Sequence, residues 1–253
     1  MNTNTPQPAQ ETIDKEELMQ QLYQRYAQGG TFFSRLRLNF TYWRKRSLWS
    51  LVIRTTYFIK RSMDILISSI ALILLSPLLL LTMLAIKLDS SGPIFFAQNR
   101  IGKWGKIFKM YKLRSMYTNA EAMKEKLLQE NETGGVTFKM KADPRITRIG
   151  KFIRKFSIDE LPQLWNVLKG DMAIVGPRPP VSKEVYEYDP EQRKRLDIKP
   201  GITCIWQVSG RSDINFDGQV HLDIEYIYSQ SILTDLKILL KTIPAVLTGR
   251  GAY

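Results

Sequence analysis

The stretch of sequence that decides the fold is ILISSIALILLSPLLLLTMLAI, which runs from Ile65 to Ile86 without a charged residue. As one helix it would reach about 33 Å, enough to cross the hydrocarbon core of a bilayer. A soluble helix is rarely apolar on every face over this length, so the stretch predicts membrane insertion. Ser76 and Pro77 stand at its midpoint. Proline removes a backbone donor there, and the serine can bond to the carbonyl that is freed.

Basic residues flank the apolar stretch on both sides, and they bear on its topology. Residues 31–62 contain eight cations and no acid, and a second group of cations lies between Lys87 and Arg114. Short positive flanks tend to stay on the cytoplasmic side of a membrane. A kinked span would carry one flank across, whereas a helix that breaks at Ser76 and Pro77 and returns keeps both on one side. We therefore favour a re-entrant helix over a span.

Aromatic residues are interspersed among the cations of residues 31–62, from Phe32 to Phe58. Aromatic rings suit the membrane–water boundary, and cations are attracted to anionic headgroups. A basic helix packed on the protein's own core would use the same residues, and so would a nucleic-acid-binding arm. The neighbouring apolar stretch favours the membrane surface.

The composition is that of a folded protein with an anionic partner. Of the 253 residues, 44% are hydrophobic and 24% are charged, and the formal net charge is +13. A surplus of this size indicates nucleic acid, anionic lipid or phosphorylated substrates. One cysteine and one histidine exclude an intrachain disulfide, a cysteine-cluster metal site and any mechanism that needs two histidines.

We expect four segments and a small α/β-like membrane-associated fold. The fold class combines a re-entrant N-terminal membrane helix, amphipathic interfacial helices and short strands. The segments are a polar, disordered tail at 1–30, a basic aromatic interfacial segment at 31–62, the re-entrant helix at 63–88 and a soluble domain at 89–253. Within that domain the pattern predicts a turn at 100–106, a strand at 107–116, helices at 119–130, 160–169 and 232–247, and a rigid loop at 175–180.

Two adjacent carboxylates, Asp159 and Glu160, are the strongest candidates for chemistry. Pro162 follows closely and suits a first helical turn, which places both acids at a helix N-terminus. Plain capping of the helix also explains such a pair. Because cations crowd the approach, the pair fits a phosphate site where one carboxylate holds Mg²⁺ and the other attacks phosphorus. Those cations are Arg145, Arg148, Lys151, Arg154 and Lys155.

Three further patterns offer groups for binding. Prolines on both sides of Arg178 pre-set the backbone, so its guanidinium could bind phosphate in bidentate fashion, or it could simply be solvated. Lys112 and Arg114 would share one face of a strand, which could equally be a solvated face. Gln207, beside a tryptophan that could as well belong to the core, could contact a sugar or a base, and Arg211 follows it.

Several motifs follow one another in a fixed order, and together they resemble a known family. They are Ser76-Pro77, KLRSM at 112–116, DPRIT at 143–147, DELPQ at 159–163, GDM at 170–172, VGPRP at 175–179 and KPGIT at 199–203. This order resembles the bacterial sugar transferases, the monotopic polyprenyl-phosphate hexose-1-phosphate transferases or small phosphoglycosyl transferases. The likeness covers residues 60–253 and nothing in residues 1–50. Larger members carry a four-helix membrane bundle and an extra soluble domain, so we expect a short form.

The resemblance implies a reaction and roles for the residues. A UDP-sugar and polyprenyl (undecaprenyl) phosphate would give polyprenyl-diphosphate-sugar and UMP, the first membrane step of exopolysaccharide, capsule or O-antigen synthesis. Asp159 would be the nucleophile that forms a phosphosugar-aspartate, and Glu160 would ligate Mg²⁺. The substrate-binding residues that we expect are Lys112, Arg114, Arg145, Arg154, Pro177, Arg178, Pro179, Gln207 and Arg211.

The resemblance also implies partners and a location. The family likeness favours UDP-galactose or UDP-glucose, with polyprenyl phosphate and membrane lipid as further partners and no nucleic acid. It places residues 89–253 as a catalytic domain on the cytoplasmic face of the bacterial inner membrane, and it leaves a homo-oligomer open. A membrane-anchored scaffold that binds nucleic acid or lipid would use the same charge. Such a scaffold would bind without turnover.

Overall fold

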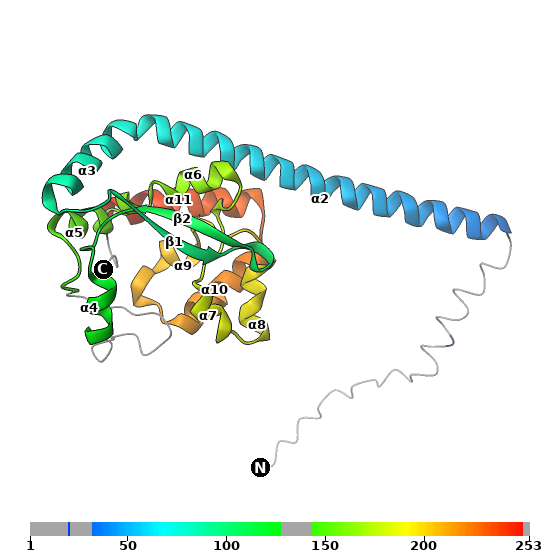
Figure 1. The fold of residues 1–253 in the computed structure, drawn as a ribbon. Coiled ribbons are helices and arrows are strands. Elements are labelled where there is room, and N and C mark those ends of the chain that lie inside the picture. The colour runs from blue at the N-terminus through cyan, green and yellow to red at the C-terminus, as the bar shows by residue number, and fades with distance from the viewer. Residues whose placement is uncertain (1–19, 21–31, 128–142, 250–253) are drawn as a thin grey trace, which may run out of the picture. The chain divides into compact units, whose positions relative to one another are not determined.

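The computed structural model describes Gln20, residues 32–127 and residues 143–249. The chain divides into two compact units, residues 1–57 and 58–253. The described residues are mostly helical with a few short strands (Figure 1). Their elements are α2 (Phe32–Leu74), α3 (Ser76–Asp89), β1 (Phe95–Ile101), β2 (Ile107–Leu113), α4 (Ala120–Leu127), α5 (Arg148–Lys155), α6 (Gln163–Lys169), β3 (Ala173–Val175), α7 (Ser182–Tyr186), α8 (Pro190–Arg193), β4 (Gly201–Thr203), α9 (Ile205–Ser209), α10 (Phe216–Tyr228) and α11 (Ile232–Thr248).

In the first unit, the described residues belong to the N-terminal part of α2. Aromatic side chains there are largely exposed, including Phe40, Trp43 and Trp49. The expected tail at residues 1–30 lies outside the described residues, apart from Gln20.

The long helix breaks where the sequence predicts. Helix α2 ends at Leu74, α3 begins at Ser76, and the two axes are bent by 60°. Pro77 cannot donate to the carbonyl of Ile73, and the Ser76 hydroxyl donates to that same oxygen at 2.8 Å. Among the described helices, none alone has the length and apolar character of a membrane span. The bent pair of α2 and α3 has both when the two helices are taken together.

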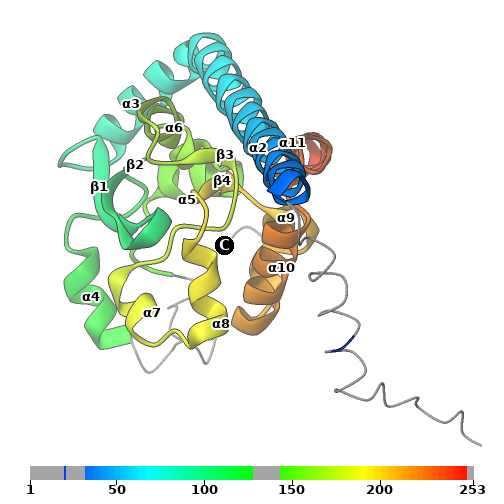
Figure 2. The same cartoon turned by 90° about the vertical axis from the view of Figure 1, so that its right-hand side faces the viewer.

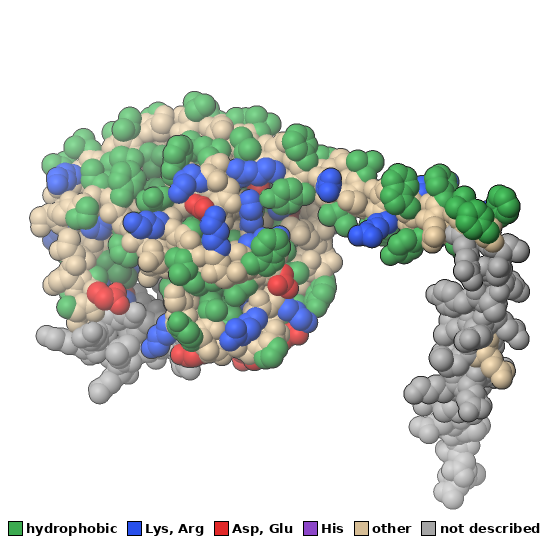
Figure 3. All heavy atoms as spheres, turned by 45° about the vertical axis from the view of Figure 1, so that its right-hand side comes forward, with side chains coloured by type: hydrophobic (Ala, Val, Ile, Leu, Met, Phe, Trp, Pro, Cys, Tyr) green, Lys and Arg blue, Asp and Glu red, His purple; other side chains and the backbone are tan. Residues whose placement is uncertain are grey.

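The two helices around the break present different faces to the protein and to the surroundings. Ser68, Leu79 and Ile86 are buried, the latter two in a hydrophobic cluster with residues of β2 and α5. The opposite face is apolar yet exposed, with Leu74 at 71% and Leu81 at 67% of full exposure. Hydrophobic side chains are accordingly visible on the surface in Figure 3. A contiguous apolar surface of this kind is unusual for a soluble monomer.

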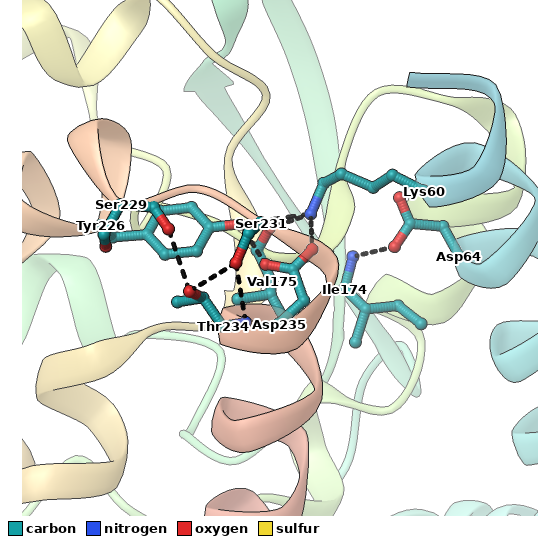
Figure 4. Close-up of polar contacts among 9 residues, drawn as sticks. All are labelled: Lys60, Asp64, Ile174, Val175, Tyr226, Ser229, Ser231, Thr234 and Asp235. Atoms are coloured by element: carbon teal, nitrogen blue, oxygen red, sulfur yellow. Dashed lines mark hydrogen bonds and ion pairs between the residues drawn. The ribbon is translucent and has the colours of Figure 1, made fainter. Parts of the chain in front are cut away.

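Lys60 fixes the second part of α2 to the domain through buried polar contacts. Its ammonium forms an ion pair with Asp235 of α11 and donates to the hydroxyl of Tyr226 and the carbonyl of Val175, both at 3.2 Å. The Tyr226 hydroxyl in turn donates to Asp235 at 2.6 Å, so four elements meet at one point (Figure 4).

Two residues near Lys60, Arg61 and Asp64, also attach α2 to the domain. Arg61 donates to the last carbonyls of α6, those of Val167 and Leu168, at 2.6 and 2.8 Å. Asp64 accepts from the backbone N–H of Ile174 in β3 at 3.1 Å. The expectation that all cations of residues 31–62 face a membrane surface is therefore wrong for Lys60 and Arg61, because buried backbone carbonyls need donors and these two supply them.

Two sheets of two strands are found in the described part of the chain. Strands β1 and β2 form an antiparallel hairpin, and β3 and β4 pair in parallel. In Figure 2 the β3–β4 pair lies near the centre of its unit, with α6 on one side and α10 on the other. The expected α/β-like class is thus confirmed only in the coarser sense of a helical domain with short strands.

The predicted elements of the soluble domain are present with shifted ends. The hairpin turn follows Ile101, the last residue of β1, the predicted strand 107–116 ends at Leu113, and the predicted helix 232–247 is α11. The predicted helix 119–130 is described only as α4, because residues 128–142 lie outside the described ranges. The core between these elements contains Phe108, Met110, Val167, Met172, Ile174, Val175, Tyr226 and Ile238.

Candidate active site

The carboxylates Asp159 and Glu160 lie in a separate turn between two helices. Residues Ile158–Glu160 form one 3₁₀ turn after α5, and α6 begins only at Gln163 with Pro162 as its N-cap. The expected helix 160–169 is therefore shorter at its start. Ser157, just before the turn, has a φ of 54°, a left-handed conformation that costs energy for a residue with a side chain. Strain of this kind recurs at functional sites and is consistent with one here.

Lys112 links the acidic turn to the hairpin. Its ammonium lies 2.6 Å from the carboxylate of Glu160, and each side chain is about a quarter exposed. Burial would raise the pKa of Glu160, but Lys112, with smaller contributions from Arg178 and Arg211, lowers the pKa below its usual value. Glu160 is therefore ionised at neutral pH.

Asp159 has a different environment from its neighbour. Its side chain is buried, and this burial raises its pKa to about 6. The charge of Glu160 adds to the increase, whereas Lys112 and Arg154 oppose it. At pH 7 Asp159 is thus mostly a carboxylate, but one that is poorly solvated. A desolvated carboxylate next to a cation is well suited to attack an electrophile.

An open pocket adjoins this turn and includes Glu160 in its lining. The residues around it come from the hairpin, α6, the loop after β3, and the β4–α9 segment. Three cations and one carboxylate, that of Glu160, are among them, so its charged lining is positive. The lining residues are Arg100, Met110, Lys112, Glu160, Gln163, Arg178, Pro179, Gly201, Ile202 and Gln207.

The loop that carries Arg178 is held by close backbone packing. A Cβ atom on Gly176 would lie 2.6 Å from the carbonyl oxygen of Lys199, and one on Gly201 would lie 2.1 Å from the nitrogen of Gly176. Only glycine fits at either position. The loop includes the buried Pro177, and the Arg178 guanidinium lies 3.8 Å from the carboxylate of Glu184. The predicted loop at 175–180 is present from Gly176 onward, since Val175 belongs to β3.

The structure brings most of the predicted site residues to this region. Lys112, Arg178, Pro179 and Gln207 line the pocket. Arg211 is 3.4 Å from the Ser157 hydroxyl. Arg154 lies close enough to lower the pKa of Asp159.

Arg114 and Arg145 lie elsewhere and have other partners. The Arg114 guanidinium donates to the carbonyls of Ser90 and Ser91, both at 2.6 Å, beyond the end of α3. Arg145 forms a bidentate pair with Asp143, with distances of 2.9 and 2.7 Å. Neither residue lines the pocket. Arg114 differs from the strand-face prediction because the strand ends at Leu113, one residue earlier.

Three pocket or loop residues were not predicted. Arg100 and Gln163 line the pocket, and Glu184 is the buried partner of Arg178. The alternation of side chains along a strand at 95–101 could have predicted that Arg100 and Gln98 share one face of the hairpin. Only the pairing of β1 with β2 shows that Lys112 lies on that same face.

The residues present fit a bound Mg²⁺. No group of three or more acidic, histidine or cysteine side chains that could hold a metal is found within the described ranges. Mg²⁺, however, commonly binds through one or two carboxylates together with substrate phosphates. Glu160 supplies an ionised carboxylate in the lining of the cationic pocket, which is a donor of this type.

The chain is similar to proteins of one family. The family profile described as "Bacterial sugar transferase" matches residues 55–249. The chain is 50% identical over 194 residues to "Galactosyl transferase CpsE" of Streptococcus agalactiae, covering 76% of this chain and 43% of that protein. It is 44% identical over 198 residues to "Exopolysaccharide production protein ExoY" of Sinorhizobium fredii, covering 77% and 88%.

A third relative has a name that states its substrate. The chain is 44% identical over 204 residues to "Undecaprenyl-phosphate galactose phosphotransferase" of Salmonella typhimurium, covering 79% of this chain and 43% of that protein. The chain thus spans less than half the length of two of these relatives and most of the third. The matched region contains the turn with Asp159, the pocket and the break between α2 and α3.

Proposed function

This chain belongs to the bacterial sugar transferase family, and we propose that it transfers a sugar-1-phosphate from a UDP-sugar to polyprenyl phosphate and releases UMP. The observation that carries the proposal is the pair of unlike carboxylates beside the cationic pocket. Asp159 is buried and has a raised pKa, whereas Glu160 has a lowered pKa and forms an ion pair with Lys112. Pairs of titratable groups with divergent pKa values commonly divide two catalytic roles.

The chemistry would proceed in two displacements at phosphorus. In the first, a carboxylate oxygen of Asp159 forms a bond to the sugar-bearing phosphorus, and the bond from that phosphorus to the bridging oxygen breaks, which releases UMP with that oxygen. In the second, an oxygen of polyprenyl phosphate bonds to the same phosphorus, and the bond to Asp159 breaks. The products are polyprenyl-diphosphate-sugar and the free carboxylate.

The remaining groups would bind and neutralise the phosphates. Arg178 and Lys112 provide positive charge in the pocket, and Arg154 provides it near Asp159. Glu160 would hold Mg²⁺ together with the phosphates of the substrate. When bound, the ion would offset negative charge on the diphosphate and orient it.

Mass spectrometry of the intact chain tests the covalent step. We expect incubation with a UDP-sugar alone, before any lipid is added, to give an adduct with the mass of a hexose phosphate on Asp159 and one equivalent of UMP. Absence of UMP for every sugar in a panel that includes UDP-galactose and UDP-glucose, even after polyprenyl phosphate is added, would reject the proposed transfer and favour a scaffold that binds without turnover. UMP release that requires polyprenyl phosphate, without an adduct, would reject only the covalent route.

We further propose that the bent helix pair enters the cytoplasmic face of the inner membrane and returns. The exposed apolar face around Leu74 and Leu81 supports this, and so does the hydrogen bond from Ser76 that stabilises the break. The arrangement would bring the acceptor lipid and a cytoplasmic UDP-sugar to one protein.

Replacing Pro77 with leucine is expected to produce a mixture of topologies. The variant regains the backbone donor to Ile73, so a continuous spanning helix becomes more favourable, and an unmet polar group in hydrocarbon costs several kcal/mol. Against this, a span must carry one basic flank across the membrane. Transfer activity should fall in proportion to the spanning fraction.

Cysteine accessibility in intact cells measures this topology. Single cysteines are placed near residues 40 and 120 in a Cys204→Ser background. In the unmutated sequence both positions should be protected from an impermeant reagent, and in Pro77→Leu one should become partly reactive. Opposite-side labelling without the proline substitution would reject the re-entrant arrangement.

A further inference from the structure

Arg100 is one of the three cations that line the pocket. We propose that Arg100 binds a phosphate group of the substrate jointly with Arg178. The inference rests on the proposed function and assigns a binding role to a residue outside the motifs of the sequence analysis.

The hairpin register directs Arg100 into the pocket. Arg100 is the penultimate residue of β1, where it is paired with Phe108, while Phe96 is paired with Lys112. Paired residues of an antiparallel ladder lie on one face, and so do alternate residues of each strand. Arg100 and Lys112 therefore share a face of the hairpin, and both line the same pocket.

The guanidinium of Arg100 has donors left for a ligand. Its Nη1 donates to the carbonyl of Pro179 at 3.0 Å, and its Nη2 donates to the side chain of Gln98 at 2.8 Å. A guanidinium has five N–H groups. The side chain is only 8% exposed, and within the described residues its buried Nε has no hydrogen-bond partner. Because buried donors are normally bonded, this unmet capacity points to a group that is supplied from outside the chain.

The charges around Arg100 favour an anion. Burial lowers the pKa of Arg100 to about 10, with repulsion by Arg178 as the next cause, while Glu184 and Glu160 oppose the decrease. Both carboxylates already have other partners, since Glu184 faces Arg178 and Glu160 faces Lys112. The guanidiniums of the buried Arg100 and the partly exposed Arg178 repel one another, and this repulsion is relieved when an anion accepts from both.

Phosphate is the anion that best fits these donors. A guanidinium matches phosphate in bidentate fashion, and Arg100 is connected through Pro179 to the loop that presents Arg178. The diphosphate of the UDP-sugar and the phosphate of the acceptor lipid share this chemistry.

Direct binding measurements test the proposal and separate the two sources. The full chain in lipid nanodiscs is titrated calorimetrically with uridine, UMP and UDP, and separately with a short-chain polyprenyl phosphate. Arg100→Gln removes the charge, Arg100→Lys keeps it without the fork, and Lys109→Gln removes an exposed cation from the same hairpin as the control. Thermal unfolding of each variant checks that it is folded.

We expect Arg100→Gln to weaken UDP binding roughly ten- to a hundredfold, as for loss of a hydrogen bond to a charged group. Uridine binding should be unchanged, Arg100→Lys should give an intermediate loss, and Lys109→Gln should match the wild type. If the lipid phosphate is the ligand, the same loss appears with polyprenyl phosphate and not with UDP. Either pattern supports a phosphate contact.

Two results would overturn the inference. One is an Arg100→Gln protein that binds both UDP and polyprenyl phosphate within about twofold of the wild type. The other is an equal loss for uridine and UDP, which indicates distortion of the loop through Pro179 rather than a phosphate contact. A wild-type chain that binds neither UDP nor polyprenyl phosphate would reject the proposed function itself, and the two failures are therefore distinguishable.

Discussion

Asp159→Asn is expected to lower transfer by roughly a thousandfold or more, as loss of a nucleophile does, while the chain remains folded. An amide cannot form the acyl phosphate. Burial raises the pKa of Asp159 in the folded protein to about 6, above the ordinary value of an aspartate. Between that ordinary pKa and pH 6, the folded protein therefore binds a proton at Asp159 more strongly than the unfolded chain does. The wild type therefore loses stability as the pH rises through that window. At pH 7 the asparagine variant, which carries no buried charge, should unfold at the same or a higher temperature.

The pH dependence of the wild type provides a second measure. Below pH 6 Asp159 becomes protonated, so kcat/KM should fall about tenfold per pH unit. The Glu160→Gln variant tests this assignment of the acid limb to Asp159. It keeps the shape of the turn and removes a charge that raises the pKa of Asp159. We expect the acid limb of its profile to move to lower pH, and its Mg²⁺ dependence to weaken. Near wild-type UMP release by Asp159→Asn would contradict the nucleophile role.

Local chemistry is the part of this protein that could be read from the sequence. The helix break depends on Pro77 and on a hydroxyl one residue away, and the structure shows the predicted hydrogen bond from Ser76. The rigid loop around Arg178 follows from its prolines in the same way. In these cases the residues that decide the conformation are neighbours in the chain.

Long-range partners could not be read in this way. Arg114 belongs to a motif in the sequence, yet it donates to carbonyls beyond the end of α3. Lys60 was grouped with surface cations, yet its partners are Val175, Tyr226 and Asp235. Each cation binds where a distant segment leaves a carbonyl or a carboxylate, and the composition of its own segment does not contain that information.

Breaking the buried ion pair between Arg195 and Asp223 should have the largest effect on stability. Both side chains are at most 3% exposed, and the carboxylate accepts from Arg195 at 2.9 and 2.7 Å. Arg195 also donates to the Tyr188 hydroxyl at 2.7 Å. Asp223→Leu leaves the guanidinium buried without its counter-charge, which costs about 3–5 kcal/mol. For a domain of this size, we expect the unfolding temperature to fall by roughly 6–20 °C.

Removing both charges together should cost much less. Despite the adjacent guanidinium, burial raises the pKa of Asp223 to about 6, so the carboxylate is less favourable in the folded protein than in water. Pairs of this kind are often no more stable than apolar residues of similar volume. In a double-mutant cycle, Arg195→Met/Asp223→Leu should therefore unfold well above both single variants. Equal unfolding temperatures for Asp223→Leu and the wild type would contradict this, and so would a double variant as unstable as the sum of the two losses.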